Sequence, residues 1–293
     1  MESNTQRSIL RTFALCLLKS AFILLLAACR VTPTPHPPAT IHLGGAHALQ
    51  LIARDLTEAY RRTHPYATFE IRASNSTIAL REFAQGQFDI ALASRSPRAD
   101  ELANTRTPGE RSPARAIDIA RDGVAVVIHP SNPLTNVTRE QLGKIYTGEI
   151  YLWSQLNANL PPGSDDAIQV ISREDGSGTR SVFEQIIMNG RRVTLTALTQ
   201  TSDADVLRYV ANNPNALGYV SANVWESQPR VHAMMIDGVA PMHETIQSGA
   251  YPLLQTLYFV VADQPRDDVS DFIDFVLSPS GHEVIQNRAA PLH

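Results

Sequence analysis

The chain has 293 residues, of which 43% are hydrophobic and 18% charged, and its formal net charge is −4. This length suggests two domains, and the apolar content is sufficient for a large core. The negative charge and the lack of a basic stripe argue against nucleic acid as a partner. An anionic ligand would have to be held by local dipoles and one or two arginines, because the overall field does not attract it.

Residues 1–29 are predicted to be a lipoprotein signal peptide. Three basic residues precede an apolar run, 21–28, that is too short to span a bilayer. Leu-Ala-Ala-Cys at 26–29 resembles the lipobox of bacterial lipoproteins. This resemblance implies cleavage before Cys29 and a diacylglycerol on its sulfur, which would anchor the protein at the extracytoplasmic face of the cell membrane. The alternative is a plain secretory signal with an incidental Cys29.

The beginning of the mature chain predicts a tether followed by an α/β unit. Residues 30–40 contain four prolines and no core pattern, which is typical of an extended tether. Residues 40–43 then read as a strand and Gly44-Gly45 as a turn. Apolar residues at helical spacing from 49 to 60 predict an amphipathic helix.

Two more polar turns follow predicted strands. A strand at 69–73 is followed by a polar turn at 74–77 and a helix at 78–85, and a buried strand at 88–93 leads into Ser94 and Arg95. In open α/β sheets, ligands bind beyond the carboxyl ends of the strands. We therefore expect these turns to contribute to one common site.

The middle and end of the chain predict two α/β lobes. Residues 101–116 read as a surface loop or short helix, and an apolar strand at 122–128 is stopped by prolines. Asp203 is expected to cap a helix, and further elements are a strand at 218–220, a strand at 253–261 and a closing helix at 269–277. The prediction is that residues 41–128 and 241–293 form lobe 1 and residues 129–240 form lobe 2. Each lobe would be a mixed β-sheet flanked by helices, with a ligand cleft between the lobes.

The most informative motif is Ser-Arg-Glu-Asp-Gly-Ser-Gly-Thr-Arg at residues 172–180. It lies between an apolar strand and residues at helical spacing, so its N–H groups belong to a helix N-terminus, which favours an anion. Ser177 and Thr179 can donate hydrogen bonds, and Arg173 offers a planar fork that suits a tetrahedral oxyanion. Asp175 is expected to hold that fork in place. The simpler interpretation is that Ser177 or Thr179 only caps a helix.

Several other functions are disfavoured by the same motif. It lacks the Gly-Lys-Ser/Thr of a phosphate-binding P-loop, and Asp175 stands where a nucleophile elbow needs its first glycine. A hydrolase that used Ser177 as nucleophile would need a general base, and no histidine lies in the motif. The nine histidines are scattered without paired metal spacing. We expect no enzyme activity, no cofactor and no metal.

From about residue 41 to 292 the chain resembles the phosphate-binding proteins that serve bacterial phosphate ABC transporters, within the type II periplasmic binding protein superfamily. Residues 173–179 carry this resemblance most specifically. The remaining landmarks occur in order along the chain: 86–95 (GQFDIALASR), 122–127 (DGVAVV), 132–134 (NPL), 145–150 (IYTGEI), Trp153, 218–220 (GYV), 236–241 (IDGVAP) and 251–253 (YPL).

The resemblance implies two lobes that close on dehydrated phosphate by a hinge motion and deliver it to membrane permease subunits. A monomer is expected, because one pair of lobes needs no second copy to bind a ligand. A sensor that docks to a membrane kinase is an alternative to transport. Ligand residues in the second lobe would be Arg173, Ser177, Gly178 and Thr179, with Asp175 orienting the arginine. First-lobe positions would be Ala46, His47, Ser76, Ser94 and Arg95.

The chain departs from the family pattern in the first lobe. Ala46-His47 replaces two expected hydroxyl residues, and Asn75 and Ala79 replace expected glycines. Arg95 stands where some members have an aspartate that accepts the proton of hydrogen phosphate. His47 would either donate to the anion or lie at the surface beside a helix start. The altered turn keeps another oxyanion open as the ligand, such as sulfate, molybdate or an organic phosphate.

Overall fold

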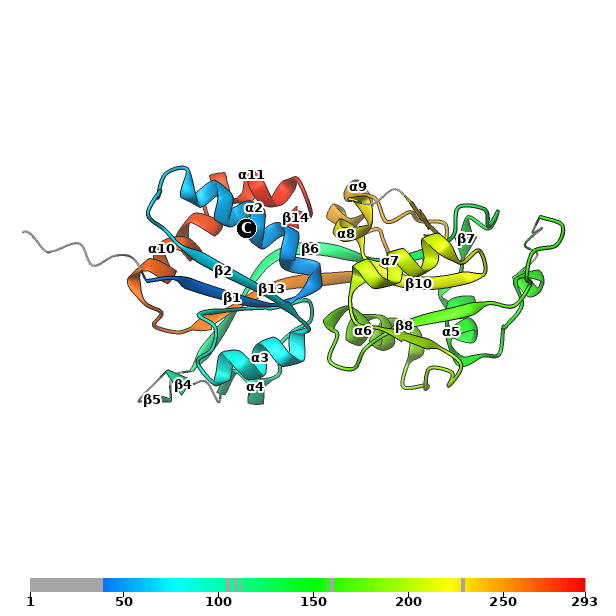
Figure 1. Ribbon diagram of the computed structural model, residues 1–293, viewed down its shortest axis with the longest axis horizontal. Coiled ribbons are helices and arrows are strands. Elements are labelled where there is room, and N and C mark those ends of the chain that lie inside the picture. The colour runs from blue at the N-terminus through cyan, green and yellow to red at the C-terminus, as the bar shows by residue number, and fades with distance from the viewer. Residues whose placement is uncertain are drawn as a thin grey trace, which may run out of the picture. The chain divides into compact units, whose positions relative to one another are not determined.

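The computed structural model describes residues 39–292, except 104–105, 108–109, 112, 157, 159–160 and 228–229. The predicted signal peptide, Cys29 and the tether up to residue 38 lie outside the described residues. None of the helices formed by the described residues is both long and apolar enough to cross a bilayer. Strands and helices alternate along the described chain (Figure 1), which confirms the predicted α/β class.

The first half of the described chain begins with the predicted strand, turn and helix units. The predicted turn at Gly44-Gly45 is wrong, because both glycines belong to β1 and the helical segment begins directly after Ala46. After β2, Asn75 separates the strand from the helix, as expected. The elements are β1 (Ile41–Ala46), η1 (His47–Leu49), α2 (Gln50–Arg61), β2 (Phe69–Ser74), α3 (Ser76–Ala84), β3 (Ile90–Ala93), α4 (Ala99–Ala103), β4 (Arg106–Thr107), β5 (Glu110–Arg111), β6 (Ala114–Ile128), β7 (Asn136–Val137) and α5 (Arg139–Thr147).

The second half repeats this alternation and ends with two helices and a short strand. The elements are η2 (Trp153–Leu156), β8 (Gln169–Arg173), α6 (Gly178–Phe183), the π-helical η3 (Glu184–Met188), β9 (Leu198–Gln200), α7 (Asp203–Asn212), β10 (Ala216–Ser221), α8 (Ala222–Glu226), β11 (His232–Ala233), β12 (Met235–Ile236), α9 (His243–Gln247), β13 (Leu254–Ala262), α10 (Asp267–Val276), α11 (Pro279–Gln286) and β14 (Ala290–Pro291).

One mixed sheet connects both lobes, in the strand order β2-β1-β3-β13-β6-β10-β8-β9. The outer pairs β1–β2, β1–β3, β8–β10 and β8–β9 are parallel, whereas β13 and β6 pair antiparallel from Leu254↔Gly123 to Ala262↔Ala114. These two long strands lie side by side where the chain passes from one lobe to the other (Figure 1). The predicted surface stretch 101–116 is partly wrong, because β6 already begins at Ala114 and pairs with β13 along its length.

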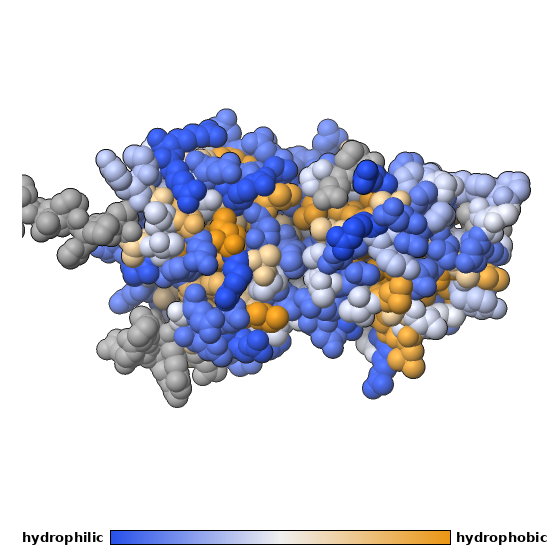
Figure 2. Space-filling view, in the orientation of Figure 1, coloured by the Kyte–Doolittle hydropathy of each residue, from blue (hydrophilic) through white to orange (hydrophobic). Residues whose placement is uncertain are grey.

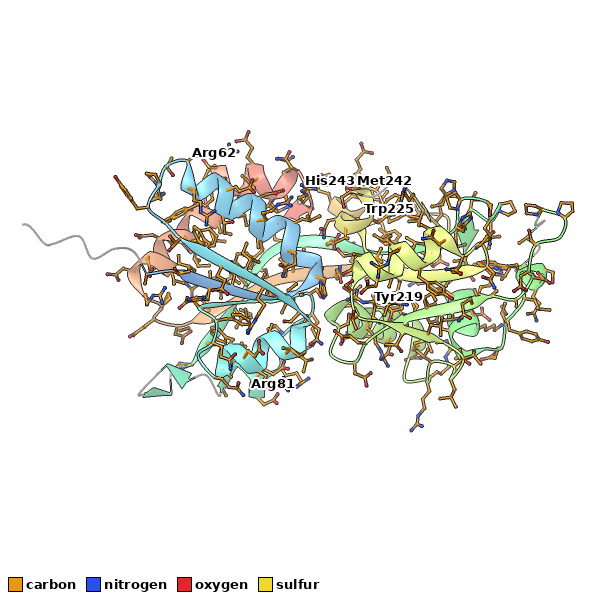
Figure 3. All side chains as sticks on the ribbon, viewed as in Figure 1. Arg62, Arg81, Tyr219, Trp225, Met242 and His243 are labelled. Atoms are coloured by element: carbon orange, nitrogen blue, oxygen red, sulfur yellow. The ribbon has the colours of Figure 1, made fainter. Side chains whose placement is uncertain are left out.

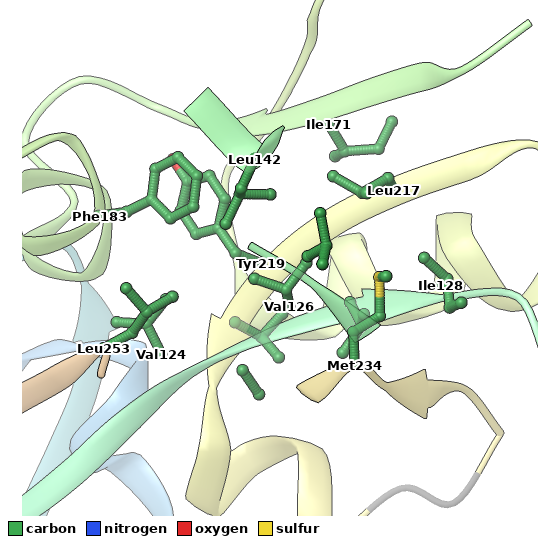
Figure 4. Close-up of a cluster of buried hydrophobic side chains, with 14 of the residues drawn as sticks. Val124, Val126, Ile128, Leu142, Ile171, Phe183, Leu217, Tyr219, Met234 and Leu253 are labelled. Atoms are coloured by element: carbon green, nitrogen blue, oxygen red, sulfur yellow. The ribbon is translucent and has the colours of Figure 1, made fainter. Parts of the chain in front are cut away.

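Each lobe has its own hydrophobic core. In the first lobe, β1 packs against α2, α10 and α11 on one face, while α3 and β3 form a smaller cluster with β13. The second core gathers residues of β6, β8, β10, α5 and α7, and Figure 4 shows its centre, with Tyr219 and Phe183 among the apolar side chains. Hydrophilic residues cover most of the face seen in Figure 2, where hydrophobic residues form separate patches.

The cores show where the chain passes from one lobe to the other. Residues 124–128 of β6 pack in the second core, whereas Ile117, Ile119 and Ala120 pack in the first. On the return, Leu253 still belongs to the second core and Leu257 to the first. The boundaries at 128 and 241 remain a prediction. The change of core lies within β6 and between Leu253 and Leu257, because a strand stays in one continuous sheet while its side chains change partners.

Asp122 lies at this crossing and forms a buried polar cluster. Its carboxylate accepts hydrogen bonds from Ser221 Oγ at 2.5 Å, Gln255 Nε2 at 2.8 Å and Asn223 Nδ2 at 3.0 Å. Burial raises the pKa of Asp122. Asn223 Nδ2 also donates to Ala48 O in the first lobe at 3.1 Å. The crossing therefore joins β6, β10, α8 and β13 through directional bonds as well as through the sheet.

Candidate functional site

A small cavity of about 10 Å³ lies between the two lobes. The residues that line it come from the ends of strands and the starts of helices: Ala46, His47, Ala48, Ser74, Asn75, Ser76, Ser94, Arg173, Ser177, Gly178, Thr179 and Asp203. A larger hollow between α2 and α11 is lined by Asp55, Glu58 and Glu283. These three carboxylates outnumber Arg62, the arginine that also lines the larger hollow, and so disfavour an anion there. We place the candidate site in the interlobe cavity.

Four helical segments begin at this cavity. The η1–α2 segment starts at His47, α3 at Ser76, α6 at Gly178 and α7 at Asp203, and all four of these residues line the cavity. A helix N-terminus carries a partial positive charge and N–H groups without partners inside the helix. Helices from both lobes therefore direct their positive ends towards the same small volume, which favours a negatively charged ligand.

Side-chain caps fix the starts of these helices. Asn75 Oδ1 accepts from the N–H of Ile78 at 2.8 Å, and Ser177 Oγ accepts from the N–H of Arg180 at 3.3 Å. The residue that caps α7 is Ser202, whose Oγ accepts from Asp205 N at 3.1 Å. The prediction that Asp203 caps this helix is wrong, because Asp203 is its first residue and turns inward. Ser177 caps α6 and also lines the cavity. The capping interpretation was therefore correct, and it does not exclude Ser177 as a ligand residue.

Arg173 and Asp203 form a buried ion pair in the cavity wall. Arg173 Nη1 lies 2.8 Å from Asp203 Oδ1, and both side chains are 2% exposed. Arg173 Nη2 also donates to Thr201 O at 3.1 Å, while Asp203 Oδ1 accepts a second bond from Ser221 N at 3.0 Å. Among the described residues, neither Arg173 Nε nor Asp203 Oδ2 has a partner. The pair is thus rigidly held, with one free donor and one free acceptor.

Tyr219 supports the strand end that presents Arg173. Its hydroxyl lies 3.1 Å from Ser172 Oγ and accepts from Arg173 N at 3.3 Å. Its ring stacks on Phe183 with the centroids 4.1 Å apart (Figure 4), and Figure 3 labels Tyr219 within the second lobe. Burial raises the pKa of Tyr219 to about 12, so the phenol stays protonated at neutral pH. This packing and the hydrogen bond from Arg173 N hold the backbone of Arg173 in place.

His47 lines the cavity, is half-buried and begins η1. Burial lowers the pKa of His47 below 6.5, the nearby Arg173 guanidinium lowers it further, and Asp203 opposes both effects. The imidazole is therefore mainly neutral at neutral pH. A neutral imidazole can donate one hydrogen bond and accept another, depending on its tautomer.

Ser76 and Ser94 bring two first-lobe hydroxyls together. Ser94 N donates to Ser76 Oγ at 3.1 Å, and the two Oγ atoms are 3.5 Å apart. Both side chains are buried at the cavity. Gly178 of the second lobe lies directly against them, since an added Cβ there would be 2.4 Å from each Oγ.

Direct hydrogen bonds hold the lobes together beside the cavity. Asn75 Nδ2 donates to Glu174 Oε1 at 2.9 Å, and Thr77 N donates to Gly176 O at 3.2 Å. These bonds and the close contact at Gly178 hold the two lobes in direct contact beside the cavity. We refer to the Asn75–Glu174 bond as the interlobe clasp.

Two predicted site residues do not line the cavity. Asp175 is 93% exposed and pairs with Arg180 Nη1 at 2.6 Å, so the prediction that it orients Arg173 is wrong. Asp203 holds that guanidinium instead. Arg95 points to Glu101, with Nη2 2.7 Å from Oε1. The other predicted residues do line the cavity: Ala46, His47, Ser76, Ser94, Arg173, Ser177, Gly178 and Thr179.

Sequence reasoning missed Asp203 and Asn75 as site residues. The available signals were a carboxylate at a predicted helix start and an asparagine in a polar turn, both of which usually indicate only a cap. Within the part of the chain that the structure describes, no group of three or more histidine, cysteine, aspartate or glutamate residues is arranged to hold a metal ion.

Residues 32–280 match the family model described as PBP superfamily domain. The phosphate-binding protein PstS of Bacillus subtilis is 24% identical over 279 residues, covering 90% of this chain and 88% of that protein. A Clostridium perfringens protein, assigned as a phosphate ABC transporter substrate-binding protein and solved with bound phosphate, is 26% identical. The two structures match with a TM-score of 0.78, and the match covers 87% of this chain and 100% of the other.

An ABC-type phosphate transport receptor from Vibrio cholerae is 28% identical with a TM-score of 0.67, covering 86% of this chain and 100% of the other. These likenesses run through both lobes and confirm the two-lobed periplasmic binding protein fold inferred from the ordered landmarks. The family model matches most of the chain, and the chain therefore belongs to the PBP superfamily.

Proposed function

We propose that this protein is a lipid-anchored extracytoplasmic receptor that captures inorganic phosphate and delivers it to the permease subunits of an ABC importer. The observation that carries the proposal is the interlobe cavity, where Arg173 meets the starts of four helical segments. One fixed guanidinium and converging helix N-termini suit a small tetrahedral oxyanion. The cavity is built from one chain, so the proposal requires no second copy.

The names of the relatives support phosphate as the ligand. The Bacillus subtilis protein is named a phosphate-binding protein, and the Clostridium perfringens structure holds phosphate. Both likenesses cover most of either chain. Ligand contacts would come from the second-lobe residues Arg173, Ser177, Gly178 and Thr179. Ser76, Ser94 and His47 would complete them from the first lobe.

Isothermal titration would test the proposed ligand. The chain from residue 30 onward, freed of bound anion, would be titrated with phosphate, sulfate and molybdate at pH 7. We expect saturable binding of phosphate with a Kd in the micromolar range or below. Tighter binding of sulfate or molybdate would mean that this oxyanion, and not phosphate, is the ligand. The absence of heat and of thermal shift with all three anions would contradict the proposal.

The anchor requires a separate experiment, because Cys29 lies outside the described residues. In a bacterial host that processes lipoproteins, the wild-type chain should appear in the membrane fraction and incorporate labelled fatty acid. Cys29→Ser should abolish labelling and release the protein from the membrane. The control is Cys16→Ser, which changes the other cysteine of the chain, within the predicted signal peptide, and should change neither result. Membrane association of Cys29→Ser equal to that of the wild type would refute the lipid anchor while leaving the phosphate proposal intact.

A further inference from the structure

We propose that Asp203 selects the protonation state of the ligand, so that the cavity prefers an oxyanion that carries a hydrogen, such as hydrogen phosphate, over one that carries none, such as sulfate. This inference rests on the proposed function and names a specificity residue for the same site. It starts from the two atoms of the buried ion pair that are left without partners.

The two oxygens of Asp203 are in different situations. Oδ1 accepts from Arg173 Nη1 at 2.8 Å and from Ser221 N at 3.0 Å. Oδ2 is buried and has no hydrogen-bond partner among the described residues. A buried carboxylate oxygen without a donor is unfavourable, because it has lost water and gained nothing in return. Since Asp203 lines the cavity, a hydrogen on the ligand can satisfy Oδ2.

Arg173 presents the complementary requirement. Its Nε is also buried and without a partner, so the same ion pair leaves one N–H that needs an acceptor. A ligand that satisfies both atoms must offer an oxygen to Arg173 and a hydrogen to Asp203. Hydrogen phosphate offers both, because it has unprotonated oxygens and one P–O–H. Sulfate at neutral pH offers only acceptors, and its lone pairs would face those of the Asp203 carboxylate.

Among the described residues that line the cavity, Asp203 is the single carboxylate. Arg95, which stands after Ser94 where an aspartate accepts the ligand proton in some relatives, is turned away to Glu101. In this chain the acceptor of the ligand hydrogen therefore lies in the second lobe, at the start of α7. A site built around a ligand hydrogen discriminates strongly against an analogue that lacks it, because a buried group is then left unpaired.

The test is the substitution Asp203→Asn in the full chain, with titration of phosphate, sulfate and monofluorophosphate at pH 8. Monofluorophosphate has the shape and charge of hydrogen phosphate but a fluorine in place of the hydroxyl, so it has no hydrogen to donate. The wild type should bind phosphate at least tenfold more tightly than either analogue. In Asp203→Asn the amide can donate where the carboxylate accepted, and each preference should fall by at least tenfold, about 1.4 kcal/mol.

The ratio of affinities separates recognition from simple positioning. If Asp203 only holds Arg173 in place, Asp203→Asn will weaken all three anions alike and leave the ratios unchanged, which would overturn the inference. Asp205→Asn is the matched control, because it removes a charge from the same helix at a residue that does not line the cavity. It should preserve the wild-type ratios.

Measurements on the wild type alone can also decide the inference. Equal binding of phosphate and monofluorophosphate by the wild type would overturn the role of Asp203, even if Asp203→Asn did not fold. Phosphate binding with no discrimination would leave the proposed function standing and remove only this inference. Absence of phosphate binding by the wild type would remove both.

Discussion

The two lobes contribute different chemistry to the cavity between them. The second lobe provides the buried charges, Arg173 and Asp203, fixed by Thr201, Ser221 and the stacked Tyr219. The first lobe provides small or neutral groups, namely Ala46, His47, Ser76 and Ser94. The second lobe is thus organised in advance to recognise charge, whereas the first closes over it with hydroxyls, an imidazole and helix N-termini. Substitutions in the two lobes should therefore impair stability and anion binding in different ways.

Arg173→Ala should give the largest effect. It removes the guanidinium and leaves Asp203 buried without its partner, which costs about 3–5 kcal/mol of unfolding free energy. We also expect anion affinity to fall at least tenfold. Arg173 is the last residue of β8 and only 2% exposed, so its loss should weaken the fold as well as the site. Urea unfolding and isothermal titration measure the two effects.

The double variant Arg173→Ala/Asp203→Ala serves as the control for this prediction. It contains no unpaired buried charge, so it should regain part of the lost stability while anion affinity stays low. Unchanged unfolding free energy in the single variant would mean that the ion pair is not the rigid centre of the second lobe.

Gly178→Ala should affect closure more than folding. The new methyl group would lie 2.4 Å from the Oγ atoms of Ser76 and Ser94 and 2.9 Å from the Ser94 carbonyl carbon, so the lobes could not approach as they do here. Alanine suits a helix, so each lobe should fold normally. We expect at least a tenfold loss of anion affinity with little change in unfolding free energy. Small-angle scattering should show weaker compaction on adding anion, and the exposed Gln185→Ala is the control. Wild-type affinity would show that Gly178 is not at the closing surface.

The interlobe clasp should have a moderate effect that can be reversed. Asn75→Asp keeps the oxygen that caps α3 but replaces the amide donor with a carboxylate facing Glu174, which lies 2.9 Å away. We expect roughly a three- to tenfold loss of anion affinity, within the range for one hydrogen bond. Adding Glu174→Gln restores a donor from the opposite side and should recover most of the loss. A double-mutant cycle measures the coupling, and additive effects would show that the two residues act independently.

His47 should give the smallest effect, visible in the pH dependence of stability. Because burial lowers the pKa of His47 from 6.5, the folded protein disfavours its protonated form. The associated stability is fully present above pH 6.5 and is lost as the pH falls through the lower pKa of the folded state. His47→Gln should remove this part of the acid dependence, with Asp203, Arg173, Glu174 and Asp205 unchanged around it. Identical profiles of unfolding free energy against pH would contradict the assignment.

Local patterns were sufficient for the elements and for many residues of the candidate site. Alternation and helical spacing predicted β2, α3, β10 and α10 to within a few residues, since these patterns depend on neighbours close in sequence. The polar turns were correctly expected to meet, because the carboxyl ends of strands in one sheet lie at a common edge. His47 was placed between two alternatives, and the structure puts it in the cavity wall.

The amino-acid sequence by itself determined the α/β class, the strand–turn–helix motif around Arg173 and the resemblance to phosphate-binding proteins. Only the tertiary structure decided which carboxylate Arg173 takes, because Asp203 is 30 residues away while Asp175, two residues away, faces solvent. It also decided the lobe crossing inside β6 and the clasp between Asn75 and Glu174, which are 99 residues apart. Such choices depend on burial and on donors brought together by the fold, and neither is encoded in the spacing of neighbouring residues.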